Sequence, residues 1–186
     1  MRTFIAVEVP EEVRGGIGQY ISMLKSIFDD VVKWVPEKNL HFTLKFLGEI
    51  KESELISVQE CVSTTVSDFR SFTLEVSGIG FFPSENKPRV LWIGTDGGSD
   101  KLLEIYQYME TCLEQKGFHR DSKTFSSHLT IGRVRKEKKL ILPERFPDFN
   151  LVTFDVRRLA VIKSTLTPAG PVYEKLFESE MKQKLE

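Results

Sequence analysis

The sequence has few of the residues that define metal centres or disulfide-stabilised folds. Only two cysteines and three histidines occur among its 186 residues, and Cys61 and Cys112 show neither CxxC nor Cys–His spacing. We therefore expect both cysteines to be reduced, buried, apolar side chains, and we expect no bound metal and no cofactor. This cysteine usage indicates a reducing compartment, so the cytoplasm is the expected location.

Long apolar stretches and a strong excess of one charge are also missing. No hydrophobic run approaches the length that crosses a membrane, and the N-terminal segment turns acidic at Glu8, too early for a signal peptide. The net charge is −1, so no global field attracts a long nucleic acid. If RNA is the partner, we expect a short piece or an end, bound locally by a monomer.

Hydrophobic alternation and turn residues predict a mixture of strands and helices. Strands are expected at residues 4–9, 40–47, 72–77, 90–95, 127–134, 152–164 and 173–177. Helices are expected at residues 10–28, 52–66 and 100–116, with a frayed helical tail at 178–186. No linker separates independent domains, so residues 1–186 are expected to form a single domain.

The chain resembles itself when it is shifted by 87 residues, the separation of His41 from His128. The same shift carries the first strand onto residues 91–96, and residues 72–77 onto residues 159–164. It predicts two copies of one unit, residues 4–77 and 91–164. The expected fold is α+β and bilobal, with an antiparallel sheet in each lobe and helices on its outer face. The lobes would be related by a pseudo-two-fold axis, with the active site in the cleft between them.

Two His-x-Thr motifs occupy equivalent strands of this repeat. Side chains two residues apart share a strand face, so His41 lies beside Thr43, and His128 beside Thr130. The opposite face is apolar, with Phe42, Leu44, Phe46, Leu129 and Ile131. Because the apolar face must cover the core, the histidines and threonines are expected to face the cleft. The third histidine, His119, belongs to no motif and is expected at the surface.

Two facing histidines suit the hydrolysis of a cyclic phosphate. In-line attack needs a base on the water and an acid on the leaving oxygen, on opposite sides of phosphorus. Histidine performs both roles near neutral pH. Thr43 and Thr130 can donate hydrogen bonds to the non-bridging oxygens. A strained five-membered cyclic phosphate does not oblige the protein to use a metal, and the near symmetry of the repeat leaves open which histidine is the acid.

Two basic residues near the motifs are candidate phosphate ligands. Arg133 closes the second motif, but strict alternation points it away from His128 unless a bulge at Gly132 re-aims it. Lys45 is expected to share the face of His41 and to bind phosphate or to be solvated. The basic run at residues 133–139 could lead an RNA tail, but a solvated turn is the expected form.

Aromatic residues near the motifs could stack a base. The candidates are Phe82, in an expected loop at residues 78–88, and Trp34, just before the first motif. Trp92, inside an expected strand, is interpreted as a packing residue.

Six segments carry a family resemblance: RTFIAVE at residues 2–8, NLHFTLKFLG at 39–48, FP at 82–83, RVLW at 89–92, SHLTIGRV at 127–134 and GPVY at 170–173. The chain resembles the two-histidine (2H) phosphoesterase superfamily, and more closely the RNA 2′,3′-cyclic phosphodiesterases, historically called 2′-5′ RNA ligases. The resemblance implies a bilobal α+β fold and hydrolysis of a 2′,3′-cyclic phosphate to a 2′-phosphate. It implies that His41 protonates the leaving 3′ oxygen and that His128 accepts a proton from water. Short oligonucleotides or RNA ends, tRNA fragments among them, would be the substrates.

Three other functions remain open at this point. The same two histidines could join RNA ends through 2′-5′ linkages, or hydrolyse a small cyclic nucleotide. A non-catalytic RNA-binding module belongs to a different class, and the two complete motifs argue against it, since binding alone needs no paired acid and base.

Overall fold

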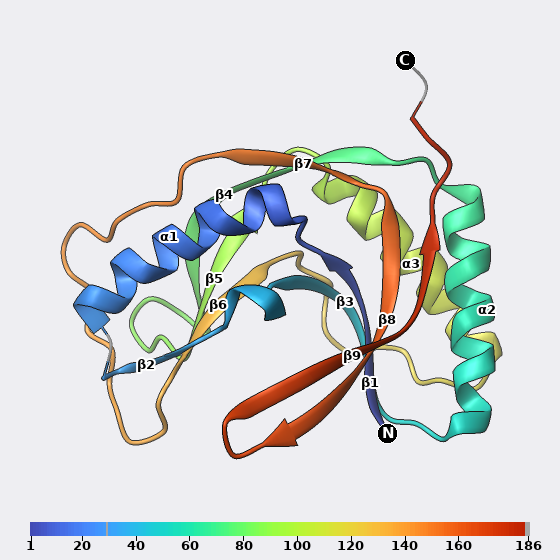
Figure 1. Ribbon diagram of the computed structural model, residues 1–186, viewed down its shortest axis with the longest axis horizontal. Coiled ribbons are helices and arrows are strands. Elements are labelled where there is room, and N and C mark those ends of the chain that lie inside the picture. Colours follow the sequence, from blue (N-terminus) through green and yellow to red (C-terminus); the bar gives the residue numbers. More distant parts are fainter. Residues whose placement is uncertain (29, 185–186) are drawn as a thin grey trace.

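The computed structural model describes residues 1–28 and 30–184 (Figure 1). Its strands are β1 (Arg2–Glu8), β2 (Val32–Trp34), β3 (His41–Glu49), β4 (Phe72–Phe82), β5 (Val90–Thr95), β6 (Leu129–Val134), β7 (Val152–Val156), β8 (Arg158–Thr167) and β9 (Gly170–Glu180). Its helices are α1 (Glu11–Phe28), α2 (Glu52–Asp68) and α3 (Ser99–Gln115), and a 3₁₀ turn, η1 (Glu37–Asn39), precedes β3.

The strands form one curled antiparallel sheet in the order β7-β4-β5-β6-β3-β1-β8-β9, with β2 paired to β6. The α+β fold expected from the sequence is confirmed, although the two halves share a continuous sheet. They meet where β3 lies beside β6, through the pairing of Phe42 with Leu129. The 87-residue shift carries β3, β1 and β4 onto β6, β5 and β8, so the order is symmetric about this boundary. We propose on this basis that residues 4–77 and 91–164 are two copies of one unit.

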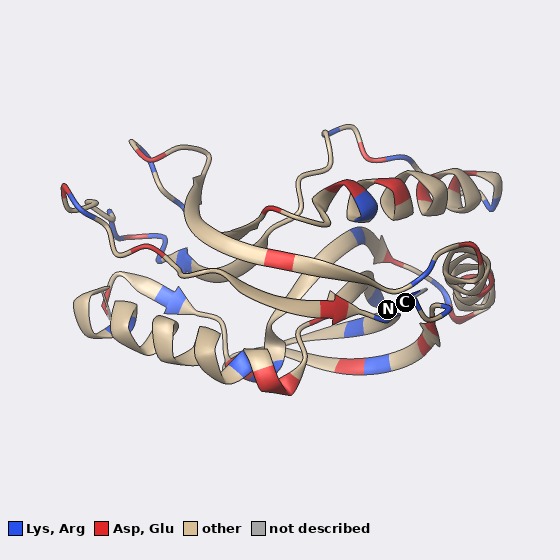
Figure 2. Cartoon of the chain, turned by 90° about the horizontal axis from the view of Figure 1, so that it is seen from above, with Lys and Arg blue, Asp and Glu red and all other residues tan. Residues whose placement is uncertain are grey.

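The helices enclose the main core against the sheet. α1 contacts β2 and β7, α3 contacts β3 and β4, and α2 lies beside α3 and contacts β8 and β9 (Figure 1). The buried face of α1 carries Ile17, Ile21 and Leu24, at the spacing of successive helical turns. Its first turn is acidic and its last turn is basic (Figure 2), and both charges stabilise the helix through its dipole.

The two cysteines form a disulfide, so the expectation of two reduced cysteines was wrong. Cys61 on α2 and Cys112 on α3 have Cα atoms 5.6 Å apart. They are brought together because α2 and α3 pack side by side, and sequence spacing carries no signal of that packing. Cys61 is buried and Cys112 is partly buried. The argument for a reducing compartment from unpaired cysteines therefore loses its basis.

Several predicted element boundaries also differ. The single strand expected at 152–164 is two strands, because the chain at Arg157 leaves the edge beside β4 and joins β1. β2 was not predicted, and β4 continues through half of the expected loop to Phe82. The tail was expected to be helical, but residues 178–180 pair with β8, because strand pairing overrides local propensity. Residues 185–186 of that predicted tail lie outside the described residues.

A bulge in β3 reverses the side-chain alternation after Thr43. Thr43 and Lys45 pair with successive residues of β1, so Leu44 is an extra residue between them. One extra residue moves the side chains that follow to the opposite face, here as far as a second bulge at Leu47. Lys45 therefore points into the core, contrary to the expectation that it shares the face of His41. Phe46, expected in the core, is 59% exposed instead.

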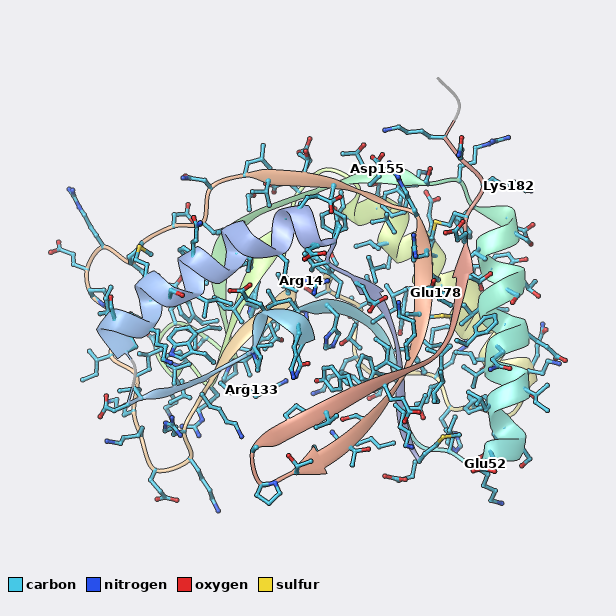
Figure 3. All side chains as sticks on the ribbon, viewed as in Figure 1. Arg14, Glu52, Arg133, Asp155, Glu178 and Lys182 are labelled. Atoms are coloured by element: carbon cyan, nitrogen blue, oxygen red, sulfur yellow. A yellow bond between two sulfur atoms is a disulfide. The ribbon has the colours of Figure 1, made fainter. Side chains whose placement is uncertain are left out.

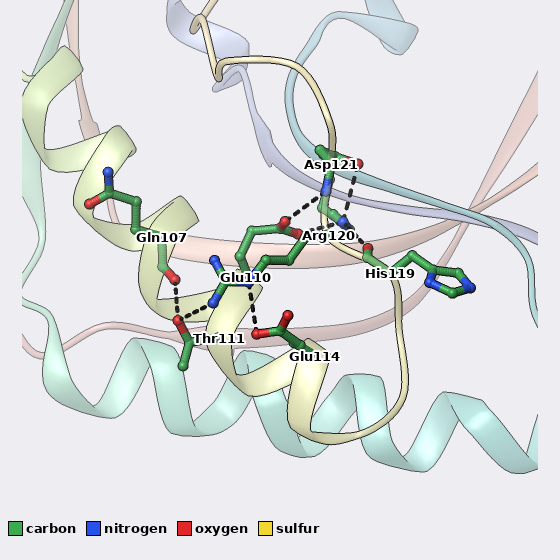
Figure 4. Close-up of polar contacts among 8 residues, drawn as sticks. Gln107, Glu110, Thr111, Glu114, His119, Arg120 and Asp121 are labelled. Carbon is green, nitrogen blue, oxygen red and sulfur yellow. Dashed lines mark hydrogen bonds and ion pairs between the residues drawn. The ribbon is translucent and has the colours of Figure 1, made fainter.

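Lys45 forms a buried ion pair with Glu110 of α3. The Nζ–Oε1 distance is 2.5 Å, and both side chains are 3% exposed. The Lys45 ammonium also lies 3.1 Å from a carboxylate oxygen of Asp121 and donates to the backbone carbonyl of His119 at 2.7 Å. The backbone N–H of Asp121 donates to Glu110 (Figure 4), and the His119 side chain is exposed, as expected. These contacts attach the segment that leads into β6 to both β3 and α3.

Replacing Lys45 by methionine should lower the free energy of unfolding by about 3–5 kcal/mol, because Glu110 is left as an uncompensated buried charge. Urea unfolding measures this loss. Lys45→Met with Glu110→Leu should recover much of it, since both charges are then removed. The matched control is Lys101→Met, because the Lys101 ammonium pairs with Glu104 at the surface and its loss should lower the stability far less. A Lys45→Met loss as small as the control's would contradict a structural role for Lys45.

Candidate active site

The two motif histidines are held in the same way. Nδ1 of His41 lies 2.7 Å from the carbonyl oxygen of Asn39, and Nδ1 of His128 lies 2.8 Å from that of Ser126. A carbonyl oxygen only accepts hydrogen bonds, so each Nδ1 carries a hydrogen and donates it. Each Nε2 is then left to accept or donate a proton. Asn39 and Ser126 are themselves 87 residues apart, so the anchoring follows the repeat.

The strand register sets both motifs on one face of the sheet. Extending the pairing of Phe42 with Leu129 by one residue on either side places His41 opposite Thr130, and Thr43 opposite His128. The two histidines then lie on a diagonal, with backbone positions about 7–8 Å apart. All four side chains are half-buried. In the part of the chain that the structure describes, neither threonine hydroxyl has a hydrogen-bond partner, so both can donate to a ligand.

Aromatic side chains flank each imidazole. The ring of His41 lies 4.8 Å from Phe4 and 5.4 Å from Tyr173, centroid to centroid. The ring of His128 lies 5.0 Å from Phe82 and 6.1 Å from Trp92. These rings cover part of each imidazole, and both histidines are half-buried.

Burial is the largest influence on the pKa of both histidines. It lowers the pKa of His41, while the hydrogen bond to the Asn39 carbonyl and the negative charge of Glu8 oppose that change. The charges of Arg133 and of His128 lower it further. The pKa of His128 is also lowered, by burial first and then by Arg133, against the hydrogen bond to the Ser126 carbonyl.

Arg133 reaches the cleft because β6 is bulged. Thr130 and Gly132 pair with successive residues of β5, so Ile131 is an extra residue. The bulge turns Arg133 to the face that His128 occupies, and its charge acts on both imidazoles. Figure 3 shows Arg133 between the β2–β6 strands and the β8–β9 hairpin.

The two bulges occupy equivalent positions, since Leu44 in β3 and Ile131 in β6 are also 87 residues apart. Each bulge moves the residue two positions later to the cleft face. In one half that residue is Arg133, and in the other half it is Phe46. The near symmetry of the repeat therefore ends with a cation on one side of the cleft and an exposed aromatic ring on the other.

A cavity of about 290 Å³ opens beside His41. It is lined by Glu8, Lys38, Asn39, Leu40, His41, Ile162, Val172, Tyr173 and Lys175. An ion pair between Glu8 and Lys175, 2.6 Å apart, borders it. The cavity gives a ligand access to the side chain of His41.

Of the two aromatic residues predicted to stack a base, one contacts a motif histidine. Phe82 ends β4 and lies edge-on to His128, half-buried. Trp34 is on β2, where its half-buried ring packs on Gly132 and on the main core. Trp92, interpreted from the sequence as a packing residue, packs on Phe82 and also lies near His128.

Sequence reasoning missed Phe4, Tyr173 and Glu8 as neighbours of His41. Alternation in β1 could have placed Phe4 on the cleft face, since Ile5 and Val7 belong to the main core. Tyr173 is brought there by the pairing of β9 with β8, which sets it opposite Ser164.

Within residues 1–28 and 30–184, no group of three or more His, Cys, Asp or Glu side chains could hold a metal ion. None of the helices there is long and apolar enough to cross a membrane.

Several known proteins are similar to this chain in sequence and in fold. Residues 7–92 match the family model described as LigT like Phosphoesterase. The chain is 38% identical to the RNA 2′,3′-cyclic phosphodiesterase of Thermotoga maritima, over 97% of this chain and 95% of that protein. It is 34% identical to the protein of the same name from Methanocaldococcus jannaschii, over 96% and 99%. A crystal structure of a Thermus thermophilus protein is 28% identical, with a TM-score of 0.86 over the full length of both chains. The chain therefore belongs to the RNA 2′,3′-cyclic phosphodiesterase family of LigT-like phosphoesterases.

Proposed function

We propose that this protein hydrolyses the 2′,3′-cyclic phosphodiester at RNA ends to a 2′-phosphate, by two-histidine acid–base catalysis without a metal. The observation that carries the proposal is the matched pair of imidazoles on one face of the sheet, each anchored through Nδ1 to a carbonyl. Such anchoring fixes the ring and directs Nε2 toward a bound phosphate. The names of the curated relatives support the substrate class.

His41 is the proposed acid and His128 the proposed base. Protonated His41 donates its Nε2 hydrogen to the leaving 3′ oxygen while neutral His128 accepts a proton from the attacking water. The P–O3′ bond breaks as the bond from water to phosphorus forms, which leaves the phosphate on the 2′ oxygen. The cavity beside His41 gives room for the ribose that carries the leaving oxygen.

The charge that gathers on the non-bridging oxygens needs donors. Thr43 and Thr130 lie on the same face as the histidines, and their hydroxyls are uncommitted among the described residues. We assign them to those oxygens, together with the guanidinium of Arg133. Lys45 takes no part, because its ammonium is buried against Glu110. Phe82 is the better placed aromatic to stack a base, since the ring of Trp34 already covers Gly132.

The acid and base roles are separable with two substrates. A 2′,3′-cyclic phosphate has a poor leaving group, which needs an acid, whereas an aryl phosphodiester has a good one. His41→Ala should lose about 10²–10⁴-fold in rate on the cyclic phosphate and much less on the aryl substrate. His128→Ala should be comparably impaired on both, because water must be deprotonated in either case.

All of these assays contain EDTA. The reverse pattern of losses would exchange the two roles and keep the site. Near-normal cyclic-phosphate hydrolysis by both folded alanine variants would remove the proposed site, and no hydrolysis by the unaltered protein would favour a binding module. Loss of activity in EDTA that Zn²⁺ or Mn²⁺ restores would contradict the metal-free mechanism.

Arg133→Gln should raise the pKa of both histidines, because the guanidinium lowers both. In the unaltered protein the two pKa values lie below the ordinary histidine value, so kcat/KM should peak on the acidic side of about pH 6.5. In the variant both limbs should move to higher pH, and kcat/KM should fall as a phosphate contact is lost. NMR titration of the imidazole protons checks the shift independently of activity. Unchanged histidine titrations in Arg133→Gln would show that Arg133 does not act on the site. Arg157→Gln, at an exposed arginine, serves as the control and should leave both titrations unchanged.

A further inference from the structure

Two cations face each other across neighbouring strands beside the cleft. Lys33 of β2 lies directly opposite Arg133 of β6 in the antiparallel register. Both side chains are exposed, and among the described residues neither has an acidic partner within ion-pair distance. Like charges placed opposite each other destabilise a strand pair, so this arrangement has no structural benefit.

The same two cations belong to a larger hollow. A groove of about 450 Å³ is lined by Lys33, Arg133, Val134, Arg135, Lys136, Glu137 and Lys138. Glu137 is the one acidic residue in the lining. Among the described residues, Lys138 is the one cation of the lining in an ion pair, with Asp30 at 3.0 Å. The molecule as a whole carries a net charge of −1, so this groove is a local concentration of positive charge.

The groove is supported by the fold. The side chain of Arg89 donates hydrogen bonds to the carbonyl oxygens of Val134, Arg135 and Lys138. The backbone N–H of Arg135 donates to the carbonyl of Val31 at 2.9 Å. Hydrogen bonds from Arg89 and to Val31 therefore fix the end of β6 and the turn that follows it. The cations of this segment are held near one another before any ligand binds.

The groove and the surroundings of the two histidines have Arg133 in common. Arg133 lines it and also acts on both motif histidines. Its other edge approaches the β8–β9 hairpin, where the end of the Lys33 side chain lies beside Gly170. An RNA strand whose terminal phosphate lies between the histidines must leave the cleft on one side. The side with the basic groove is the one that attracts the remaining phosphates of the strand.

We propose that this groove binds the internucleotide phosphates of the RNA strand on the 5′ side of its cyclic end, with Lys33 and Arg135 as the principal contacts beyond Arg133. The proposal rests on the proposed function and specifies it: the preferred substrate is an oligonucleotide, and a mononucleotide lacks the phosphates that the groove holds. Charge-assisted contacts of this kind are salt-dependent and carry no base specificity.

The test compares three substrates that share one terminal nucleoside 2′,3′-cyclic phosphate: the mononucleotide, a trinucleotide, and the same trinucleotide with neutral methylphosphonate linkages. The natural trinucleotide should exceed the mononucleotide in kcat/KM by about tenfold or more, as expected for charge-assisted contacts. The gain should shrink as salt is raised and should be absent with methylphosphonate linkages. Equal kcat/KM for the mononucleotide and the natural trinucleotide, or a gain that survives in the methylphosphonate, would overturn the proposal.

Variants locate the effect. Lys33→Gln and Arg135→Gln should each reduce the ratio of trinucleotide to mononucleotide kcat/KM several-fold. Lys101→Gln, on the outer surface of α3, should keep the ratio. The melting temperature of Lys33→Gln should be no lower than that of the unaltered protein, because a like-charge pair is relieved. A ratio unchanged in both groove variants would overturn the assignment of these residues.

Two readouts separate this proposal from the function on which it rests. Hydrolysis of the mononucleotide reports the catalytic site alone, so its failure would count against the proposed function. The affinity of a fluorescent trinucleotide 2′-phosphate reports the groove even in the absence of turnover, and it should weaken in Lys33→Gln. Affinity that is equal in the variant and insensitive to salt would count against an RNA-phosphate groove and would leave an acidic protein partner as the occupant.

Discussion

Phe42 and Leu129 pair across the boundary between β3 and β6, and both side chains are fully enclosed in the main core. Their burial is the constraint on which the site depends. Because neighbouring residues of a strand face opposite sides, burying these two turns His41, Thr43, His128 and Thr130 to the cleft face together. The same pairing sets each histidine opposite the threonine of the other motif. One apolar contact thus both joins the halves of the sheet and brings together the proposed acid, the proposed base and the proposed oxyanion donors.

The bulges that follow make the two halves chemically unlike. After Leu44 the chain turns Lys45 into the core, where it pairs with Glu110 and holds the segment leading to β6. After Ile131 it turns Arg133 to the cleft, where the cation acts on both histidines and begins the basic groove. A symmetric pair of strands therefore supplies a symmetric pair of imidazoles, while the proposed contacts to phosphate and to the RNA strand fall on one side.

The sequence allowed the prediction of whatever depends on local alternation and on the repeat. His41, His128 and their threonines could be placed on one face because strand periodicity and the 87-residue shift agree. Lys45 and Phe46 were assigned to the wrong faces, because a bulge is set by pairing with β1 and leaves no mark on the periodicity. The disulfide depends on the packing of α2 against α3, and the strand conformation of residues 178–180 on their pairing with β8. These are contacts between distant segments, which composition and spacing do not encode.

The central claim is that one phosphate is held between the two imidazoles, and a structure with a nucleoside 2′,3′-cyclic vanadate tests it most directly. Vanadate adopts the five-coordinate geometry of in-line displacement at phosphorus. The account predicts Nε2 of His41 and Nε2 of His128 within about 2.6–3.2 Å of the two apical oxygens, one on each side of vanadium. His41 should lie at the ribose 3′ oxygen and His128 at the oxygen that represents water. Vanadate bound away from both imidazoles, or held by one while the other points elsewhere, would contradict it.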